Sequence, residues 1–531
     1  MYNGEEWLGA APEIEAAQIK KKVQTDIVVI GGGLAGIAAA RRAVELGARV
    51  VLFEKCAGIQ ARSGDFAVLD SRVAGRWGRA TVDKTAIVAD LMRDMAYKAS
   101  QDILMRWAEE AGAAFDWYLE AVPGGVPVLD TTFDPPPKNC VCWVQPRRLP
   151  LPEGFDNAQE HYKCYQTTAW VRPTHIPVCQ ANYATAEQSG LLTTFFSAPV
   201  RRLLRAGEGR VEGVIAESED GYIQAVASMG LILATGDYMN DPAMLRRFLP
   251  GYVDTPKLWT SYDKEHRPSN TGDGHRLGLW VGAKLQEQPH AASAHHMGSV
   301  FGANGFLLLN NRGRRFVNED APGQQLGSQI ENLPNKTAWQ FVDGNWRTWV
   351  PQGYPSHGCV CYVLDDERLR SEQVYEKLST IDNIVTPELV ERAVTAGKLL
   401  QEDSLEALVR KTGLPEQTAL KEIQRYNTLC LQGRDTDFGK TSRRLFPVAQ
   451  PPFYAAKFTP ATMIIAMGGL QSDAEARCYD VKGCVIPGLY LAGNVQGNRI
   501  AVDYPLTVPG LSHSLALTYG RIAAQSAVAG L

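Results

Sequence analysis

The sequence has little net charge and no long apolar run. Its 531 residues carry a formal net charge of −4 at pH 7. With no long basic run, this argues against binding to nucleic acid or to an anionic membrane through bulk electrostatics. No apolar run is long enough to cross a bilayer, and residues 1–24 lack a basic start followed by an apolar signal core. The sequence therefore predicts a cytoplasmic protein without a membrane span, unless an export signal has been removed.

The ten cysteines do not follow the spacing of a disulfide framework or of a common metal motif. Irregular spacing in a long chain is typical of a reduced compartment, and the absence of CxxCH argues against covalent haem. The pairs Cys140/Cys142 and Cys359/Cys361 could together supply four thiols to an iron–sulfur cluster. Because the usual CxxC spacing is missing, we favour buried, inert thiols and predict no metal site.

The most informative segment is residues 25–55, TDIVVIGGGLAGIAAARRAVELGARVVLFEK. It reads as an apolar strand, a glycine turn, a helix of small residues and a second strand that ends in an acid. Gly31 allows the sharp turn, Gly33 leaves room for the backbone to approach a pyrophosphate, and Gly36 lets the helix pack closely on the sheet. Phosphate groups would meet the unpaired N–H groups at the helix N-terminus. The segment therefore predicts a dinucleotide-binding α/β unit.

Two acidic residues have predicted roles beside this unit. Glu54 follows the first glycine by about 20 residues, where it can accept hydrogen bonds from ribose hydroxyls. Asp273 precedes the helical run HRLGLWVGAKL and is expected to cap it. The runs YIQAVAS (222–228) and MGLILATGDY (229–238) are expected as separate strands, and the second ends in a tight turn that can press backbone against a cofactor.

Composition and pattern divide the chain into a tail, a discontinuous α/β domain and an inserted domain. The α/β domain is expected to contain a proline- and cysteine-rich insertion and to end in a helix that begins after Pro509-Gly510. The inserted domain is rich in polar helices and loops. The expected boundaries are 1–24 for the tail, 25–287 and 446–531 for the two parts of the α/β domain, 122–177 for the insertion, and 288–445 for the inserted domain.

Seven motifs occur in an order that resembles the flavoprotein family of fumarate reductase, succinate dehydrogenase and 3-ketosteroid dehydrogenase, over nearly the whole chain. The resemblance implies FAD, rather than a nicotinamide cofactor, in the glycine-turn site. It also implies a Rossmann-like FAD-binding domain with an inserted α+β capping domain. The motifs are GGGLAG with Glu54-Lys55, Ser63-Gly64, ATGD at 234–237, TGDGH at 271–275, GRRFVNED at 313–320, MGGL at 467–470 and IPGLYLAGN at 486–494.

The resemblance also implies positions for the parts of FAD. Ser63 and Gly64 would face the isoalloxazine, Gly493 and Asn494 the diphosphate and ribityl region, and residues 512–515 the pyrimidine edge. N–H groups at a helix start would stabilise negative charge on the reduced flavin. The alternative is ordinary tight turns and a capped helix. The predicted FAD-binding residues are Gly31, Gly33, Leu34, Ala35, Gly36, Glu54, Lys55, Arg62, Ser63, Gly64, Ala234, Thr235, Gly236, Asp273, Gly493, Asn494, Ser512 and Leu515.

The sequence departs from fumarate reductases at two substrate-binding positions. In that family an arginine follows the RFVNE segment and a histidine precedes MGG, whereas this chain has Gly323 and the run Ile464-Ile465-Ala466. A dicarboxylate carries two charges that need paired cations once dehydrated. Fumarate and succinate are therefore not the expected substrates.

The segment Asp503-Tyr504-Pro505 is similar to the tyrosine-proline segment of ketosteroid dehydrogenases and of fumarate-reductase-like enoate reductases. This implies that Tyr504 lies over the flavin and transfers a proton or polarises a carbonyl, which a phenol can do because it both donates and accepts. The alternative is a tyrosine packed at a strand end with its hydroxyl satisfied. Ketosteroid dehydrogenases carry a second tyrosine after their NE segment, where this chain has Pro322-Gly323.

Three further side chains are weaker catalytic candidates. Arg499 could orient a carbonyl or phenolate, with an exposed or FAD-paired arginine as the alternative. His295 and His296 could lie near the junction of the two domains, with a solvated or core histidine pair as the commoner explanation.

Together these observations predict an FAD-dependent oxidoreductase that acts on CH–CH groups, most readily by reducing a C=C bond conjugated to a carbonyl. The expected substrate is large and weakly charged, that is steroid-like, bile-acid-like, phenolic or polyphenol-derived. Electrons would come from a separate reductase, a ferredoxin or free reduced flavin. The alternatives are a 3-ketosteroid-type dehydrogenase running in reverse, an electron-transfer subunit resembling adenylylsulfate reductase, and a flavin-binding protein without catalysis.

Overall fold

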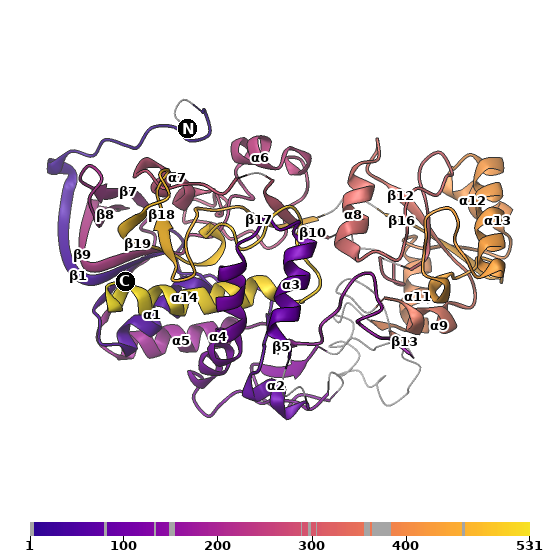
Figure 1. Cartoon of the computed structure of the whole chain (residues 1–531), viewed down its shortest axis with the longest axis horizontal. Helices are drawn as coiled ribbons and strands as arrows, with labels where there is room; N and C mark the ends of the chain where they lie inside the picture. Colours follow the sequence, from indigo (N-terminus) through magenta and orange to yellow (C-terminus); the bar gives the residue numbers. More distant parts are fainter. Residues whose placement is uncertain are drawn as a thin grey trace. The chain divides into compact units, whose positions relative to one another are not determined.

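The chain folds into two compact units in the computed structural model (Figure 1). The first unit is assembled from residues 1–147, 167–293 and 464–531, and the second from 148–166 and 294–463. The first unit is therefore discontinuous in sequence. The described residues are 5–78, 82–131, 134–147, 154–287, 289–295, 299–303, 305–354, 362–363, 384–458 and 462–531.

The first unit is built on a mostly parallel sheet. Within the described ranges this sheet has eight strands, in the order β18-β19-β9-β1-β2-β6, and β8 and β7 continue from β9. β1 pairs in parallel with β2 and β9, and β19 pairs in parallel with β9. Buried apolar runs in these strands are typical of a sheet covered by helices. The strands are β1 (Ile19–Ile30), β2 (Val50–Phe53), β6 (Leu192–Phe195), β7 (Val200–Arg205), β8 (Val211–Ser218), β9 (Gly221–Leu233), β18 (Arg477–Tyr479) and β19 (Val485–Leu491).

The helices of this unit pack closely because small residues lie at their contacts. α1 contacts α14 and α5, and α14 contacts α4. A Cβ atom on Gly520 of α14 would lie 2.4 Å from the carbonyl oxygen of Ala35 in α1, so the helices approach only with glycine there. The helices are α1 (Leu34–Glu45), α2 (Arg72–Arg76), α3 (Lys84–Asp94), α4 (Gln101–Glu120), α5 (Ile176–Gln188), α6 (Pro242–Phe248), α7 (Asp273–Trp280) and α14 (Leu511–Ala529).

One strand prediction was wrong. The runs 222–228 and 229–238 do not form two strands, because β9 continues through both and pairs with β1 along its length. The expected break is a register shift between the Thr25–Ala227 and Ile27–Gly230 pairs. A bulge of this kind adds a residue without ending the strand.

Part of the proline- and cysteine-rich insertion forms a small antiparallel sheet in the first unit. Its order is β3-β5-β4, with β3 (Asp65–Ala67), β5 (Thr168–Arg172) and β4 (Trp143–Pro146). A further two-stranded sheet joins β10 (Ala291–His295) and β17 (Thr462–Met467). Residues 148–166 of the insertion belong to the second unit.

The second unit centres on a four-stranded sheet with the order β11-β12-β16-β15. Its paired strands are antiparallel, and β16 lies beyond residue 445, where we expected the α/β domain to resume. The second unit instead continues to residue 463, because β16 pairs with β12 and β15. Its elements are β11 (Leu307–Leu309), α8 (Gly323–Glu331), β12 (Ala338–Val342), α9 (Trp346–Trp349), β13 (Tyr362–Val363), β14 (Ile384–Val385), α11 (Pro387–Thr395), β15 (Leu400–Glu402), α12 (Leu405–Thr412), α13 (Glu416–Gln432) and β16 (Phe453–Phe458).

The GRRFVNED motif forms buried ion pairs inside the second unit. Arg315 contacts Glu319 at 2.7 Å and Asp435 at 2.8 Å, and all three side chains are buried. Arg444 pairs with Asp320 at 2.9 Å between its Nη2 atom and Oδ2. Removing one partner of such a pair leaves an uncompensated buried charge. The motif therefore has a structural role in the core of this unit.

Candidate functional site

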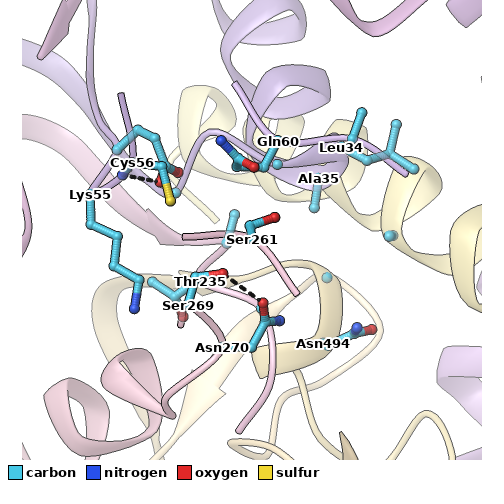
Figure 2. A pocket seen from close by; sticks show the side chains of 18 of the residues that line it. Leu34, Ala35, Lys55, Cys56, Gln60, Thr235, Ser261, Ser269, Asn270 and Asn494 are labelled. Atoms are coloured by element: carbon cyan, nitrogen blue, oxygen red, sulfur yellow. Dashed lines mark hydrogen bonds between the residues drawn. The ribbon is translucent and has the colours of Figure 1, made fainter. Parts of the chain in front are cut away.

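A deep pocket of the first unit brings together most of the predicted FAD-binding residues (Figure 2). It encloses about 1290 Å³, including space open to solvent. Figure 2 shows Leu34, Ala35 and Gln60 on one side of the pocket and Asn270 and Asn494 on the other. The predicted residues that line it are Gly31, Gly33, Leu34, Ala35, Glu54, Lys55, Arg62, Ser63, Ala234, Thr235, Gly236, Asp273, Gly493, Asn494 and Ser512. Gly36, Gly64 and Leu515 are not among the lining residues.

The glycine turn has the geometry that a pyrophosphate site needs. Gly31 has φ +107°, and a Cβ there would lie 2.4 Å from the carbonyl oxygen of Ala234. A Cβ on Gly36 would lie 1.9 Å from the carbonyl oxygen of Gly31. Gly33 differs, because the atom nearest to a Cβ at this position would be the Gln60 carbonyl oxygen, at 3.7 Å. Gly31 and Gly36 are thus required by the fold, whereas Gly33 lines the pocket with open space beside it.

Glu54 is buried at the end of β2 and is held by backbone N–H groups. Its Oε2 atom accepts from Gly32 at 2.5 Å, and its Oε1 atom accepts from Cys56 at 2.7 Å. These bonds fix the carboxylate at the rim of the glycine turn. Hydrogen bonding from Glu54 to a ribose stays a prediction.

The role predicted for Asp273 as a helix cap was wrong. It is the first residue of α7, the N-cap position is Gly272, and no side chain caps the helix. The Asp273 carboxylate instead contacts the Lys55 ammonium at 2.8 Å and accepts from the Thr271 hydroxyl at 2.9 Å. Lys55 lowers the pKa of Asp273 against the opposing effect of burial. Lys55, two residues after the end of β2, therefore pairs with the carboxylate that local sequence assigned to the helix start.

The segment predicted to face the isoalloxazine is held by two histidines. Ser63 has φ +63°, a strained conformation for a residue other than glycine. The Nε2 atoms of His175 and His513 each lie 3.0 Å from the carbonyl oxygen of Arg62. The backbone N–H of His175 also donates to the Ser63 carbonyl at 3.0 Å. A Cβ on Gly64 would lie 2.1 Å from Val171 O, so that glycine packs rather than lining the pocket.

Sequence reasoning missed His175, and it included His513 only as part of the 512–515 segment expected at the pyrimidine edge. Both histidines line the pocket. They reach Arg62 from 113 and 451 positions away in the chain, so no local pattern signals them. Burial lowers the pKa of His175 to about 3 and also lowers that of His513. Both imidazoles are therefore neutral at pH 7 and can each donate from Nε2 to the shared carbonyl.

A polar network lies beside the tight turn at residues 234–236. Asp237 is fully buried, and its Oδ2 atom accepts from Asn270 at 3.0 Å and from Asn494 at 3.4 Å. Asn494 in turn accepts from Arg499 at 3.0 Å. Because Asn270, Asn494 and Gly236 line the pocket, this network forms one of its walls.

Tyr504 lies buried next to the pocket. Its hydroxyl oxygen accepts from the backbone N–H of Ser512 at 3.2 Å, in the first turn of α14. Burial raises the pKa of Tyr504 to about 12, whereas Arg499 and the Ser512 N–H favour its ionised form. The phenol therefore keeps its proton at neutral pH, and the bond to Ser512 does not use that proton.

Arg499 is buried in the same loop. Besides Asn494, its guanidinium donates from Nε to the carbonyl oxygen of Gln496 at 3.0 Å. Its Nη1 atom has no hydrogen-bond partner among the described residues. Burial lowers the pKa of Arg499 to about 10, which still leaves it charged at neutral pH. Arg499 is not among the lining residues of the pocket and reaches its wall through Asn494.

The remaining candidates are placed less fully. His296 lies outside the described residues, and His295 is described only as the last backbone position of β10. Cys359 and Cys361 also lie outside them, while Cys142 is buried and Cys140 is half-buried. Within the described ranges no group of three or more His, Cys, Asp or Glu side chains could hold a metal ion. None of the helices described there is long and apolar enough to span a membrane.

The buried imidazoles predict that the protein loses stability in acid. Burial lowers the pKa of His275 and of His290 to about 4, as it lowers that of His175. Each folded-state pKa is below the unfolded value, so the unfolded chain binds more protons below about pH 6.5. The contribution of each neutral imidazole to the free energy of unfolding should be fully present above that pH. It should fall as pH drops toward 4, with a loss of about 2 kcal/mol per imidazole at pH 5.

Urea unfolding at pH 7 and pH 5 measures this loss. The Nδ1 atom of His290 is hydrogen-bonded to the Tyr238 hydroxyl at 2.7 Å. His290→Gln keeps a polar side chain beside this hydroxyl and removes one titrating group. The variant should show a smaller difference in unfolding free energy between the two pH values than the native chain. Equal differences in the two proteins would contradict the assignment.

The fold and the pocket together define a flavoprotein-type dinucleotide site. The glycine turn leaves space beside Gly33, two neutral imidazoles fix the next segment, and the lining residue Asn494 is held by the buried Arg499 guanidinium. The residues present therefore fit FAD, whose diphosphate would lie at Gly33 and the start of α1.

Comparison with known proteins identifies the family. Residues 26–506 match the model of the FAD binding domain family, so the chain belongs to that family. It is 27% identical over 521 residues to a vinyl phenol reductase of Lactiplantibacillus plantarum, with 93% of this chain and 94% of that protein covered. The predicted FAD cofactor and the class of FAD-dependent oxidoreductase acting on CH–CH groups are thereby confirmed.

Solved structures share the fold. A 3-ketosteroid-Δ4-(5α)-dehydrogenase from Rhodococcus jostii has a TM-score of 0.71 at 19% identity, covering 97% of this chain and 99% of that one. A flavocytochrome c3 fumarate reductase has a TM-score of 0.62 at 20% identity, covering 97% of this chain and 79% of that one. The predicted α/β fold and its resemblance to these flavoproteins are confirmed.

Proposed function

We propose that the protein reduces an activated C=C bond in a weakly charged substrate, with FAD as the hydride carrier and Tyr504 as the proton donor. The observation that carries this proposal is the place of the Tyr504 phenol. It is buried and protonated, and its oxygen is 3.2 Å from the backbone N of Ser512, which lines the FAD pocket.

The proposed reaction needs one hydride and one proton. FAD, when bound, supplies the hydride chemistry. Tyr504 would give its proton to the second carbon of the double bond, so that C=C becomes CH–CH, and the phenolate would then regain a proton from solvent. The Ser512 N–H and the nearby Arg499 charge favour the phenolate during that exchange. Arg499 would also orient a carbonyl or phenolate on the substrate through its unpaired Nη1.

The substrate class follows from the pocket lining near β17. Ile464 and Ile465 line the pocket there, ahead of the MGGL segment. Apolar side chains at this place do not compensate a dehydrated carboxylate. A vinyl phenol, the substrate in the name of one relative, is a neutral conjugated alkene. We therefore propose vinyl phenols and enones as the first substrates to test, and a separate reductase, ferredoxin or reduced flavin as the electron source.

Turnover with a reduced viologen dye as the electron source tests the proposal. Purified FAD-loaded protein should oxidise the dye when 4-vinylphenol or a cyclic enone is added, and should do so much more slowly with fumarate. Preference for fumarate would contradict the substrate class. No dye oxidation with any unsaturated compound would favour a flavin-binding protein without catalysis.

A further inference from the structure

Asp237 ends a buried hydrogen-bonded chain that begins at Arg499 and passes through the side chain of Asn494. Arg499 Nη2 donates to Asn494 Oδ1 at 3.0 Å, and Asn494 Nδ2 donates to Asp237 Oδ2 at 3.4 Å. Asp237 has no exposed surface, and 2% of Arg499 is exposed. Asn494 lines the FAD pocket between these two charges.

Which groups donate and which accept in these hydrogen bonds follows from the chemistry of the arginine side chain. A guanidinium can only donate, so the Asn494 oxygen must face Arg499 and its NH₂ group must face residue 237. Residue 237 must therefore accept. The Asp237 carboxylate does so, and its other hydrogen-bond partners, the Asn270 amide and the Met239 backbone N–H, also donate to it.

We propose that Asp237 is a positioning residue that holds Asn494 and, through it, Arg499 in place, and that its negative charge offsets the cations of Arg499 and of Arg62, which lines the pocket. Asp237 does not itself line the pocket, so it would act through Asn494. Burial raises the pKa of Asp237, and Arg62, whose Nη2 atom lies 3.9 Å away, opposes that rise. A set of partners that all donate favours the ionised carboxylate.

The consequence concerns how strongly the bound cofactor gives up electrons. An uncompensated cation beside a reduced flavin would stabilise its negative charge and make it a weaker reductant. By offsetting Arg499 and Arg62, Asp237 would keep the cofactor able to reduce a C=C bond. The statement about C=C reduction rests on the proposed function, whereas the expected effect of Asp237 on the flavin potential does not.

Asp237→Asn tests the proposal because asparagine cannot replace the carboxylate here. In one orientation the asparagine oxygen accepts from Asn270 and Asn494, and its NH₂ group then faces another donor, the Met239 N–H. In the other orientation its NH₂ group faces the donating amides of Asn270 and Asn494. The charge is lost in either case. We expect the midpoint potential of bound FAD, measured by equilibration with reference dyes, to shift to a more positive value.

Asp241→Asn is the matched control. Asp241 is also a mostly buried aspartate, but it caps α6 and pairs with Arg276 at 2.6 Å, away from the pocket lining. Both variants should lower the melting temperature, and only Asp237→Asn should move the potential. An unchanged potential in Asp237→Asn, or an equal shift in both variants, would overturn the proposal.

A second comparison applies if Asp237→Asn does not fold or retain FAD. Asn494→Leu and Arg499→Gln, alone and combined, interrupt the same chain. The proposal predicts non-additive shifts, because Asn494→Leu acts on the potential through Arg499: its effect should be much smaller in the Arg499→Gln background than in the native chain. Additive shifts would overturn it. Neither experiment uses an alkene substrate, so failure here is distinguishable from failure of the proposed reductase activity.

Discussion

Replacing Tyr504 with phenylalanine should leave a yellow, FAD-containing protein that has lost turnover by about 10²-fold or more, the range expected when a general acid is removed. Phenylalanine keeps the buried ring and removes only the hydroxyl, whose oxygen accepts from the Ser512 N–H at 3.2 Å. The rate should be measured as reoxidation of the photoreduced protein by 4-vinylphenol, which isolates the step that needs the proton.

Tyr519→Phe is the matched control for this change. Tyr519 is also buried, and its hydroxyl donates to the Ile103 carbonyl at 3.0 Å within the same unit. Its loss should lower stability without a comparable loss of rate. If Tyr504→Phe reoxidises at the native rate, Tyr504 is not the proton donor.

The second large effect is expected at Gly33. Valine there should abolish FAD retention, because its side chain would keep the backbone and the pyrophosphate of FAD from coming close together. The fold itself should tolerate the change. Gly33 has φ −84°, which any residue adopts, and the atom nearest to a Cβ would be at 3.7 Å. We therefore expect an apoprotein that melts near the temperature of the native apoprotein and binds FAD at least about 10²-fold more weakly, a loss of about 3 kcal/mol.

Gly36→Val provides the contrast. Its Cβ would overlap the Gly31 carbonyl oxygen, so this variant should fail to fold rather than fold without cofactor. FAD titration monitored by flavin fluorescence, together with apoprotein melting curves, separates the two outcomes. Full FAD occupancy in Gly33→Val would contradict the position assigned to the diphosphate.

The dinucleotide unit was predictable because its signals are local. Residues 25–55 contain strand, glycine turn, helix, second strand and terminal acid in one continuous stretch, and the structure has β1, α1 and β2 in that order. The role of Gly36 follows from a backbone contact inside the turn, whereas Gly31 is also restricted by the carbonyl oxygen of Ala234, beyond the end of β9. Local pattern therefore carried the dinucleotide-binding unit, whereas FAD as the cofactor came from the resemblance to the flavoprotein family.

The parts that sequence reasoning missed depend on contacts between distant segments. His175 reaches Arg62 across 113 positions, and Lys55 reaches Asp273 across 218. In the second case a long-range ion pair replaced the local capping bond that the helix start suggested. The register shift inside β9 is similar, because pairing with β1 decided that the strand continues.

The domain boundary near residue 445 shows the same limit. Composition changes there, but β16 stays with the second unit because it pairs with β12 and β15. Strand pairing of this kind is set by the whole sheet and not by the sequence of one strand. The buried network of Asp237, Asn494 and Arg499 likewise joins residues that no spacing rule connects.

The central claim is that reduced cofactor in this pocket passes a hydride to a weakly charged alkene. A single-turnover experiment tests it most directly: the photoreduced protein is mixed without oxygen with one equivalent of 4-vinylphenol, and the flavin spectrum and product are followed together. The account predicts that the oxidised flavin spectrum returns as one equivalent of 4-ethylphenol forms. A flavin that stays reduced with 4-vinylphenol and with a cyclic enone, or that is reoxidised faster by fumarate, would contradict it.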